Sequence, residues 1–287
     1  MVIATLRRAE VLASTLAAVA ACTPPPAEVL VVDGDERRSA EPTAGAAGVR
    51  YLWSPPGLTR QRNLGLASAS GDVVVFLDDD ARPRPDALAR LTAAYTDPGV
   101  VGATGRVVEP ASNRVVGKES KLRRALHLGA EGTFTAYGYP RRITRTDAPR
   151  DVECMSGCFM SARVPVAAAL RFDERLSGYG LAEDEDFSYR LSRRGRIRYV
   201  PDAVVDHDNA GFGGRDRVAF NRAVVVHRAY LFAKNFPQTP RARAGFTLLV
   251  PALVAHRLLN GDLAGVRGLL RGAHEAREAR RTGEWAL

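Results

Sequence analysis

Three consecutive carboxylates, Asp78, Asp79 and Asp80, end an apolar run from Val73 to Leu77. The run is rich in β-branched side chains, which predicts a buried strand of a parallel sheet. Adjacent like charges at a strand end repel one another unless a cation or hydrogen-bond donors stabilise them. A divalent cation that carries a diphosphate would do so, because such ions prefer oxygen ligands. A solvated acidic turn after the strand is the alternative.

A second acidic cluster, Glu183 to Asp186, opens a predicted helix that extends to about Arg193. Carboxylates in the first turn of a helix are stabilised by the helix dipole, so this cluster also has a purely structural explanation. Downstream, the run that begins at Asp202 predicts a short strand that ends at His207. A lone histidine is usually packed or solvated. At a strand end beyond two acidic clusters, however, an imidazole is also a suitable ligand for a borderline divalent ion.

Predicted strands and helices alternate along the first two thirds of the chain. Apolar runs predict strands at residues 2–5, 28–32, 49–53, 73–77, 100–108 and 202–207. Helices are predicted at residues 10–21, 59–69, 85–95 and 183–193, with a short one from Pro165. The segment before Val49 is predicted as a loop, and Thr59 as the N-cap of the next helix. This alternation predicts an α/β fold with a mainly parallel sheet.

The composition is that of an ordinary soluble globular protein, with 287 residues, 46% of them hydrophobic and 25% charged. This length suffices for one large domain or two small ones. Three scattered cysteines do not form a disulfide framework, so a reducing compartment is expected. Cys154 and Cys158 have no second cysteine pair or nearby histidine, so a zinc site is not predicted. No basic region precedes an apolar core at the N-terminus, so no signal peptide is predicted.

The net charge of +9 is concentrated in the last quarter of the chain, where residues 213–287 contain thirteen Arg and Lys against five Asp and Glu. The nearly neutral remainder argues against a nucleic-acid-binding protein. Two apolar runs, Val224–Phe232 and Phe246–Leu259, are interrupted by Arg, His or Pro, and neither is predicted to reach the roughly 20 apolar residues that span a bilayer. Two interpretations stay open. The segment forms helices with a basic face to solvent, or an amphipathic surface that binds anionic lipid head groups.

The order of these motifs resembles that of the family-2 glycosyltransferases. The resemblance covers about Val2 to His207 and rests on six segments in the same order: VIATLRRAEVL, VLVVDGDE, GLTRQRNLGLASASGDVVVFLDDD, SGCFMSARVPV, RFDERLSGYGLAEDEDFSYRLSRRG and RIRYVPDAVVDHD. It implies a GT-A fold, in which helices flank a Rossmann-like, mainly parallel sheet. It also implies a GT-A domain at 1–211, with a nucleotide-binding half at 1–108 and an acceptor and catalytic half at 109–211. A helical, basic C-terminal extension at 212–287 would follow.

The resemblance also implies roles for individual residues. The donor site would contain Thr5, Asp33, Arg62, Asp78 and Asp79. Within this set, Thr5 and Asp33 would contact the nucleoside, Arg62 would lie near the base or the diphosphate, and Asp78 would touch the ribose. Asp80 and His207 would hold Mn²⁺ or Mg²⁺. Asp184 would be the general base that takes the proton of the attacking hydroxyl.

The implied activity is inverting, metal-dependent and non-processive transfer of a sugar from a UDP- or dTDP-type donor to an acceptor hydroxyl. A cell-envelope, lipid-linked or natural-product acceptor is expected, read by residues 109–150 and 178–181. No Gln-x-x-Arg-Trp element follows the second acidic cluster, which favours transfer of a single sugar over a processive synthase. Asp33-Gly34-Asp35 departs from the acidic-Gly-Ser run of the family. We expect a cytoplasmic enzyme in peripheral contact with the inner face of the cell membrane.

Two other classes of protein share part of the pattern. Phosphatases of the haloacid-dehalogenase type place a similar Asp-x-Asp after a strand, but near the N-terminus and with a Thr or Val soon afterwards, whereas Ala81-Arg82 follows here. A catalytically inactive sugar-binding relative is the second alternative. The joint presence of Asp78, Asp80, Asp184 and His207 argues against it, because a binding scaffold has no need of all four.

Overall fold

The computed structural model describes residues 1–109, 114–115, 130–143, 148–176, 181–208 and 216–287. The chain forms two compact units. One comprises Met1–Lys118 and Arg142–Ala210, and the other Glu119–Arg141 and Gly211–Leu287. The domain division predicted at 211–212 stays a prediction, and the described residues 130–141, placed in the first domain by the sequence, group with the C-terminal helices.

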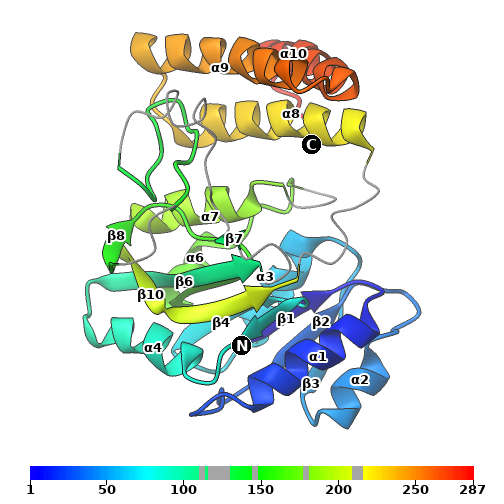
Figure 1. The fold of residues 1–287 in the computed structure, drawn as a ribbon, viewed down its shortest axis with the longest axis vertical. Helices are drawn as coiled ribbons and strands as arrows, with labels where there is room; N and C mark the ends of the chain where they lie inside the picture. Colours follow the sequence, from blue (N-terminus) through cyan, green and yellow to red (C-terminus); the bar gives the residue numbers. More distant parts are fainter. Residues whose placement is uncertain (110–113, 116–129, 144–147, 177–180, 209–215) are drawn as a thin grey trace. The chain divides into compact units, whose positions relative to one another are not determined.

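The first unit is built on a ten-stranded sheet with the order β3-β2-β1-β4-β9-β6-β10-β5, in which β7 also pairs with β6 and β8 with β10 (Figure 1). The strands are β1 (Val2–Thr5), β2 (Leu30–Asp33), β3 (Arg50–Trp53), β4 (Val73–Asp78), β5 (Ala81–Pro83), β6 (Val100–Glu109), β7 (Arg114–Val115), β8 (Arg150–Val152), β9 (Phe159–Arg163) and β10 (Arg196–His207). Strands β3, β2, β1 and β4 are parallel, as are β6 and β10, while β9 lies antiparallel between β4 and β6. The predicted α/β fold with a mainly parallel sheet is confirmed.

Helices cover both faces of this sheet (Figure 1). They are α1 (Ala9–Ala20), α2 (Glu41–Ala46), α3 (Leu58–Ser68), α4 (Ala87–Ala93), α6 (Val164–Leu170) and α7 (Glu183–Ser192). Because successive strand residues point to opposite faces, β4 contributes to two buried clusters. Val75 and Leu77 pack with residues of α1, α2 and α4. Val74 and Phe76 pack with residues of α3, α6 and α7.

A cluster of aromatic rings fixes α7 over the central strand. Phe76 of β4 meets Phe172 edge to face with ring centroids 5.0 Å apart, and Phe172 stacks on Phe187 of α7 at 4.3 Å. Phe76 and Phe187 are fully buried and Phe172 nearly so, so these contacts combine area burial with favourable ring geometry. The acidic first turn of α7 is thereby positioned relative to the end of β4.

Three local predictions differ from the structure. The segment before Val49, predicted as a loop, contains the short helix α2, which Pro42 starts without loss of a needed N–H. The N-cap of α3 is Gly57 rather than Thr59, because its φ of 146° suits glycine. Strand β10 begins at Arg196 rather than at Asp202, and its register with β6 shifts between Val200 and Val204. Pro201 therefore marks an irregularity inside the strand and not its start.

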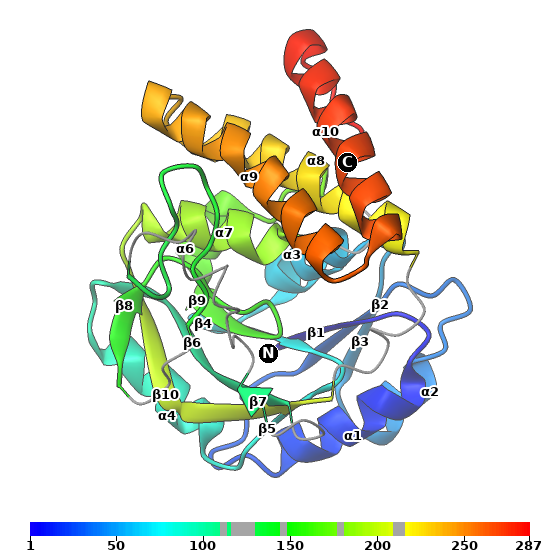
Figure 2. The same cartoon turned by 45° about the horizontal axis from the view of Figure 1, so that its top comes forward.

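The described residues of the second unit include the helices α8 (Arg217–Asn235), α9 (Pro240–Leu259) and α10 (Leu263–Thr282) (Figure 2). The Asp216, Thr239 and Asp262 side chains cap their N-termini by accepting backbone N–H groups. Helix α10 approaches α8 closely at Gly268 and Gly272. A Cβ at these positions would lie 2.4 Å from Val218 O and 2.5 Å from Arg222 O. The predicted helical C-terminal segment is thus present.

Among the described residues, α9 alone is long and apolar enough to cross a membrane, judged by length and composition. The apolar run Phe246–Leu259 within it was predicted to fall short of the roughly 20 apolar residues that span a bilayer. The helix is longer than that run because it begins at Pro240 and includes Arg241 and Arg243. Only 17% of its apolar window is buried.

Candidate active site

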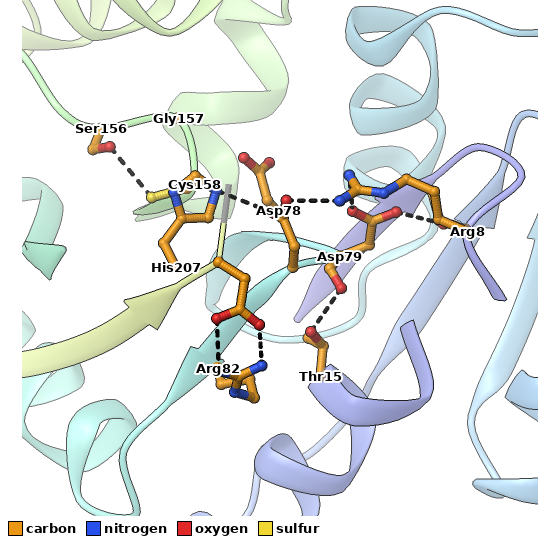
Figure 3. Close-up of polar contacts among 12 residues, drawn as sticks. Arg8, Thr15, Asp78, Asp79, Arg82, Ser156, Gly157, Cys158 and His207 are labelled. Carbon is orange, nitrogen blue, oxygen red and sulfur yellow. Dashed lines mark hydrogen bonds and ion pairs between the residues drawn. The ribbon is translucent and has the colours of Figure 1, made fainter. Parts of the chain in front are cut away.

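The end of β4 and the end of β10 bring the predicted site residues Asp78, Asp80 and His207 together. Figure 3 shows Asp78 and His207 of this set. The short strand β5 pairs antiparallel with β10, so that His207 lies opposite Ala81, the residue after Asp80. The Asp208 N–H donates to the backbone oxygen of Asp80 at 3.1 Å. His207 Nε2 lies 3.0 Å from Asp80 Oδ1. One ligand atom from each of Asp78, Asp80 and His207 lies within 4.8 Å of the others.

The donor set of this cluster fits a divalent cation. Two carboxylates and an imidazole suit Mn²⁺, and the carboxylates alone suit Mg²⁺. Burial alone would raise the pKa of Asp80, but the hydrogen bonds with His207 and Arg8 outweigh the effect of burial and lower this pKa to about 2. The Asp80 carboxyl group is therefore ionised. Asp78, expected on the ribose, lies in the same cluster as the two predicted metal ligands.

Asp79 turns away from this cluster into the protein. Its carboxylate accepts the Thr5 hydroxyl and an Arg8 N–H, both at 2.7 Å, and its backbone oxygen accepts the Thr15 hydroxyl. Burial raises the pKa of Asp79 to about 6 despite these partners. Asp79 is almost inaccessible, so the predicted donor contacts of Asp79 and Thr5 are not supported by this geometry. The two side chains stabilise the acidic turn.

Arg8 was not predicted as a site residue. Its guanidinium bridges Asp79 and Asp80, with N–O distances of 2.7 Å to each. It precedes α1 and so approaches the acidic turn from the end of β1. The arginine pair after the first strand, Arg7-Arg8, was the available sequence signal. A cation beside three carboxylates lowers their mutual repulsion, so Arg8 helps to stabilise the three consecutive aspartates.

Arg62 connects the three elements that surround the site. Buried at 2% exposure, it donates to Asp78 Oδ1 at 2.9 Å, to the Gly157 carbonyl at 2.8 Å and to Glu183 Oε1 at 2.5 Å. The other oxygen of Glu183 has no hydrogen-bond partner among the described residues. Arg62 therefore holds α3, the end of β4 and the start of α7 together. The predicted direct contact with base or diphosphate would require this buried network to open.

Asp184 lies in the first turn of α7, half-buried beside the turn that contains Gly157. Its Oδ2 accepts the Gly157 N–H at 3.1 Å, and its Oδ1 accepts the Glu185 N–H at 2.9 Å. Burial raises the pKa of Asp184, and the Glu185 carboxylate adds to this rise. The last residue of the acidic cluster, Asp186, is fully buried and paired with Arg190. Asp184 is held in a fixed orientation by two backbone donors, and Gly157, which supplies one of them, also accepts an N–H of Arg62, the partner of Asp78.

Asp33 has a structural role in this fold. It is fully buried, and its two oxygens accept the Asp35 N–H, the Ala40 N–H and the Tyr51 hydroxyl at 2.8–3.2 Å. The contact with the nucleoside predicted for Asp33 is therefore not supported. Burial, together with the Asp33 carboxylate, raises the pKa of the Tyr51 hydroxyl, which remains a donor.

A cavity of about 620 Å³ lies at the carboxyl ends of β1 and β2. Its charged lining comes from Arg7, Arg8, Arg37, Asp35 and Glu10. Arg8 also pairs with Asp80, so the cavity adjoins the cluster of Asp78, Asp80 and His207. In open α/β sheets, ligands bind at this edge. Most of the residues predicted to read the acceptor, 109–150 and 178–181, lie outside the described residues.

The family model for glycosyl transferase family 2 matches residues 1–168, more than half of the chain. The chain belongs to this glycosyltransferase family. The match includes Asp78 and Asp80 but ends before Asp184 and His207, so the place of these two residues rests on geometry. Curated relatives in two Mycobacterium tuberculosis strains, each called pre-mycofactocin glycosyltransferase, are 31% identical over 157 residues. The match spans 52% of this glycosyltransferase but only 29% of those relatives.

Solved glycosyltransferase structures share the fold. The mannosyltransferase PcManGT from Pyrobaculum calidifontis, in complex with GDP-Man and Mn²⁺, has a TM-score of 0.58 at 18% identity, with coverage of 99% of this chain and 75% of that one. GalNAc-T7, with UDP, GalNAc and Mn²⁺, has a TM-score of 0.57 at 17% identity, with coverage of 92% and 57%. Glucosyl-3-phosphoglycerate synthase from Mycobacterium tuberculosis has a TM-score of 0.53 at 18% identity, with coverage of 83% and 80%. The protein is therefore a family-2 glycosyltransferase with a GT-A fold.

Proposed function

We propose that this glycosyltransferase transfers one sugar from a nucleoside-diphosphate sugar to an acceptor hydroxyl, with inversion at the anomeric carbon. The observation that carries the proposal is the convergence of Asp78, Asp80 and His207 within reach of one cation. Arg62 links Asp78 of this cluster to Glu183, the neighbour of Asp184. A cation site and a fixed carboxylate base are the two parts that such a transfer needs.

Each site residue has a defined task in this proposal. Asp78, Asp80 and His207 hold Mn²⁺ or Mg²⁺, which supplies positive charge to the diphosphate leaving group when bound. Asp184 accepts the proton of the acceptor hydroxyl, and its two backbone donors keep the carboxylate oriented. The raised pKa of Asp184 makes it a stronger base than a solvated aspartate.

The donor nucleoside occupies the cavity lined by Arg7, Arg8, Arg37 and Asp35. A uridine- or thymidine-type donor is our first choice, and a guanosine donor is a second, because a similar fold was solved with GDP-Man. The name of the curated relatives supports a natural-product acceptor, beside the cell-envelope and lipid-linked acceptors expected from the sequence. A cytoplasmic location with peripheral membrane contact is part of the proposal.

A panel of UDP-, dTDP- and GDP-sugars tests this function. With Mn²⁺ present, one donor should raise the melting temperature and slowly release nucleoside diphosphate even without an acceptor. EDTA should abolish both effects. Release of phosphate from simple monoesters, with no response to any nucleotide sugar, would favour the phosphatase alternative. Binding of a donor without any turnover, after acceptors of the three classes were supplied, would favour an inactive relative.

A further inference from the structure

Large apolar side chains that face solvent are concentrated on two helices of the second unit. Seven such residues are exposed in the described chain, and five of them lie on α9 and α10. These five, here called the leucine surface, are Leu248, Leu258, Leu259, Leu263 and Leu270. Leu259 is 82% exposed and Leu248 68%. Leu258, Leu259 and Leu263 lie close together in sequence where α9 ends and α10 begins, and a contiguous apolar patch on a soluble protein usually marks a binding surface.

The exposed side of α9 is uncharged over most of its length. From Ala244 to Leu259, the most exposed residues are apolar except Thr247, and the one arginine in this range, Arg257, is 34% exposed and pairs with Asp262 at 3.4 Å. The opposite side is packed. Phe246 stacks on Phe232 of α8 with ring centroids 4.8 Å apart, and the Arg280 guanidinium of α10 lies 4.5 Å from the Phe246 ring. A surface helix in a soluble protein normally places charged residues on its outer face, so the outer face of α9 is adapted to an apolar environment.

Exposed basic residues lie on the same two helices as the leucine surface. Arg241 and Arg243 lie at the start of α9, and Arg267 and Arg271 lie between and beside the exposed leucines of α10, all with exposed side chains. Helix α9 contains no Asp or Glu. Within the described residues, Arg241 and Arg267 form no ion pair. Exposed leucines flanked by arginines match the two components of an anionic bilayer surface, its acyl boundary and its negatively charged head groups.

We propose that the leucine surface docks the protein on an anionic lipid bilayer, with α9 lying in the plane of the interface. If α9 crossed the bilayer, the contacts of Phe246 with α8 and α10 would lie in lipid. If α9 lies in the plane of the interface, these contacts are kept. A second copy of the chain is a poorer occupant. In a two-fold symmetric contact the same patch meets itself, so the arginines that flank it would repel one another.

Vesicle co-sedimentation tests the proposal with the full chain. The protein should bind vesicles that contain phosphatidylglycerol at low salt and bind purely phosphatidylcholine vesicles more weakly. High salt should weaken binding to the anionic vesicles only in part, because the leucines contribute independently of charge. Equal and negligible sedimentation with both vesicle types would overturn the proposal.

Two pairs of substitutions locate the contact. Leu258→Glu with Leu259→Glu should lower the partition coefficient onto anionic vesicles by at least about tenfold. Ala233→Glu with Ala286→Glu adds the same charge at exposed positions outside the leucine surface and serves as the control. The control should lower the partition coefficient much less. Equal losses in both pairs would show that net charge alone drives binding and would contradict the proposal.

Folding and self-association are measured on the same proteins. Unchanged circular dichroism and melting temperature of the leucine variant show that the loss of binding is local. If wild-type protein is a dimer that the leucine variant converts to a monomer, and neither binds vesicles, the occupant is a second copy and the proposal fails. The docking proposal deepens the membrane contact included in the proposed function. Release of nucleoside diphosphate in solution should be the same in all variants, so failure of the docking proposal is distinguishable from failure of the proposed sugar transfer.

Discussion

The Asp184 carboxylate is held by two backbone donors, the N–H groups of Gly157 and Glu185. Such a fixed carboxylate can accept a proton without first reorienting. Asp184→Asn keeps the size of the side chain but removes the proton acceptor. We expect donor binding to be nearly unchanged and transfer to fall by ~10²- to 10⁴-fold. Single-turnover transfer beside donor titration separates the two effects, and a variant with wild-type turnover would move the base to another residue.

The pH profile of transfer gives a second, independent test of the same group. Burial raises the pKa of Asp184, and only its deprotonated form can act as a base. Activity should therefore rise with pH on the acid side, with an apparent pKa above the ~3.9 of a solvated aspartate. The residual activity of Asp184→Asn should lack this limb. An identical limb in wild type and variant would assign the titration to a different group.

Residue types at strand ends indicated that Asp78 to Asp80 and His207 could serve a divalent cation, and the family resemblance implied that Asp80 and His207 hold it while Asp78 touches the ribose. The structure places one ligand atom of Asp78 within reach of the same cation. Pattern alone could not predict which carboxylates face the ligand. Asp79 and Asp33 have the same chemistry as Asp80, but tertiary hydrogen bonds from Thr5, Arg8 and Tyr51 engage them inside the protein. Such partners lie far apart in sequence, so the sequence alone does not reveal them.

At the scale of elements, α3, β4 and α7 depend on one another through Arg62. Arg62→Ala would leave the buried Glu183 carboxylate without its charged partner, which typically costs about 3–5 kcal/mol of unfolding free energy. Arg60→Ala is the matched control on the same helix. Arg60 is about half exposed and pairs with Glu174 at 3.6 Å, so its loss should cost about 0–1 kcal/mol.

Urea denaturation measures both losses. Replacing both partners of the buried pair by apolar residues, as in Arg62→Met with Glu183→Leu, should restore part of the stability, because no unpaired carboxylate is then left at the buried position 183. A cost for Arg62→Ala no larger than that for Arg60→Ala would contradict the role of Arg62 as the connection between these elements.

The element pattern was predicted where the residues were strongly apolar or helical, as in β1, β4 and α7. Helices and strands were predicted wrongly where the local composition favoured one structure and tertiary packing another. The Ala, Gly and Pro of Glu41–Ala46 indicated a loop, yet this helix packs through the buried Ala44. Pro201 suggested a strand start, but neighbouring strands keep β10 continuous around it. In both cases tertiary contacts outweighed local preference.

At the scale of the whole molecule, the proposals assign different ligands to the two units. Donor with Mn²⁺ should slow amide hydrogen exchange in the peptides that contain β4, β5 and the end of β10. Anionic vesicles should slow it in α9 and the start of α10. Binding that stabilises a native region raises its protection in this way. Protection of α9 by the donor, with none at β4, would contradict the assignment of the donor site.

The direct test of the central claim is Mn²⁺ binding in the presence of nucleoside diphosphate, measured from the free-ion electron paramagnetic resonance signal. We expect wild-type protein to bind one Mn²⁺ at the cluster of Asp78, Asp80 and His207, and His207→Ala to weaken binding by about 10-fold or more. Asp206→Asn, beside His207 but paired with Arg84, is the control and should bind as wild type does. Equal Mn²⁺ affinity in wild type and His207→Ala, or no binding by wild type, would contradict the account.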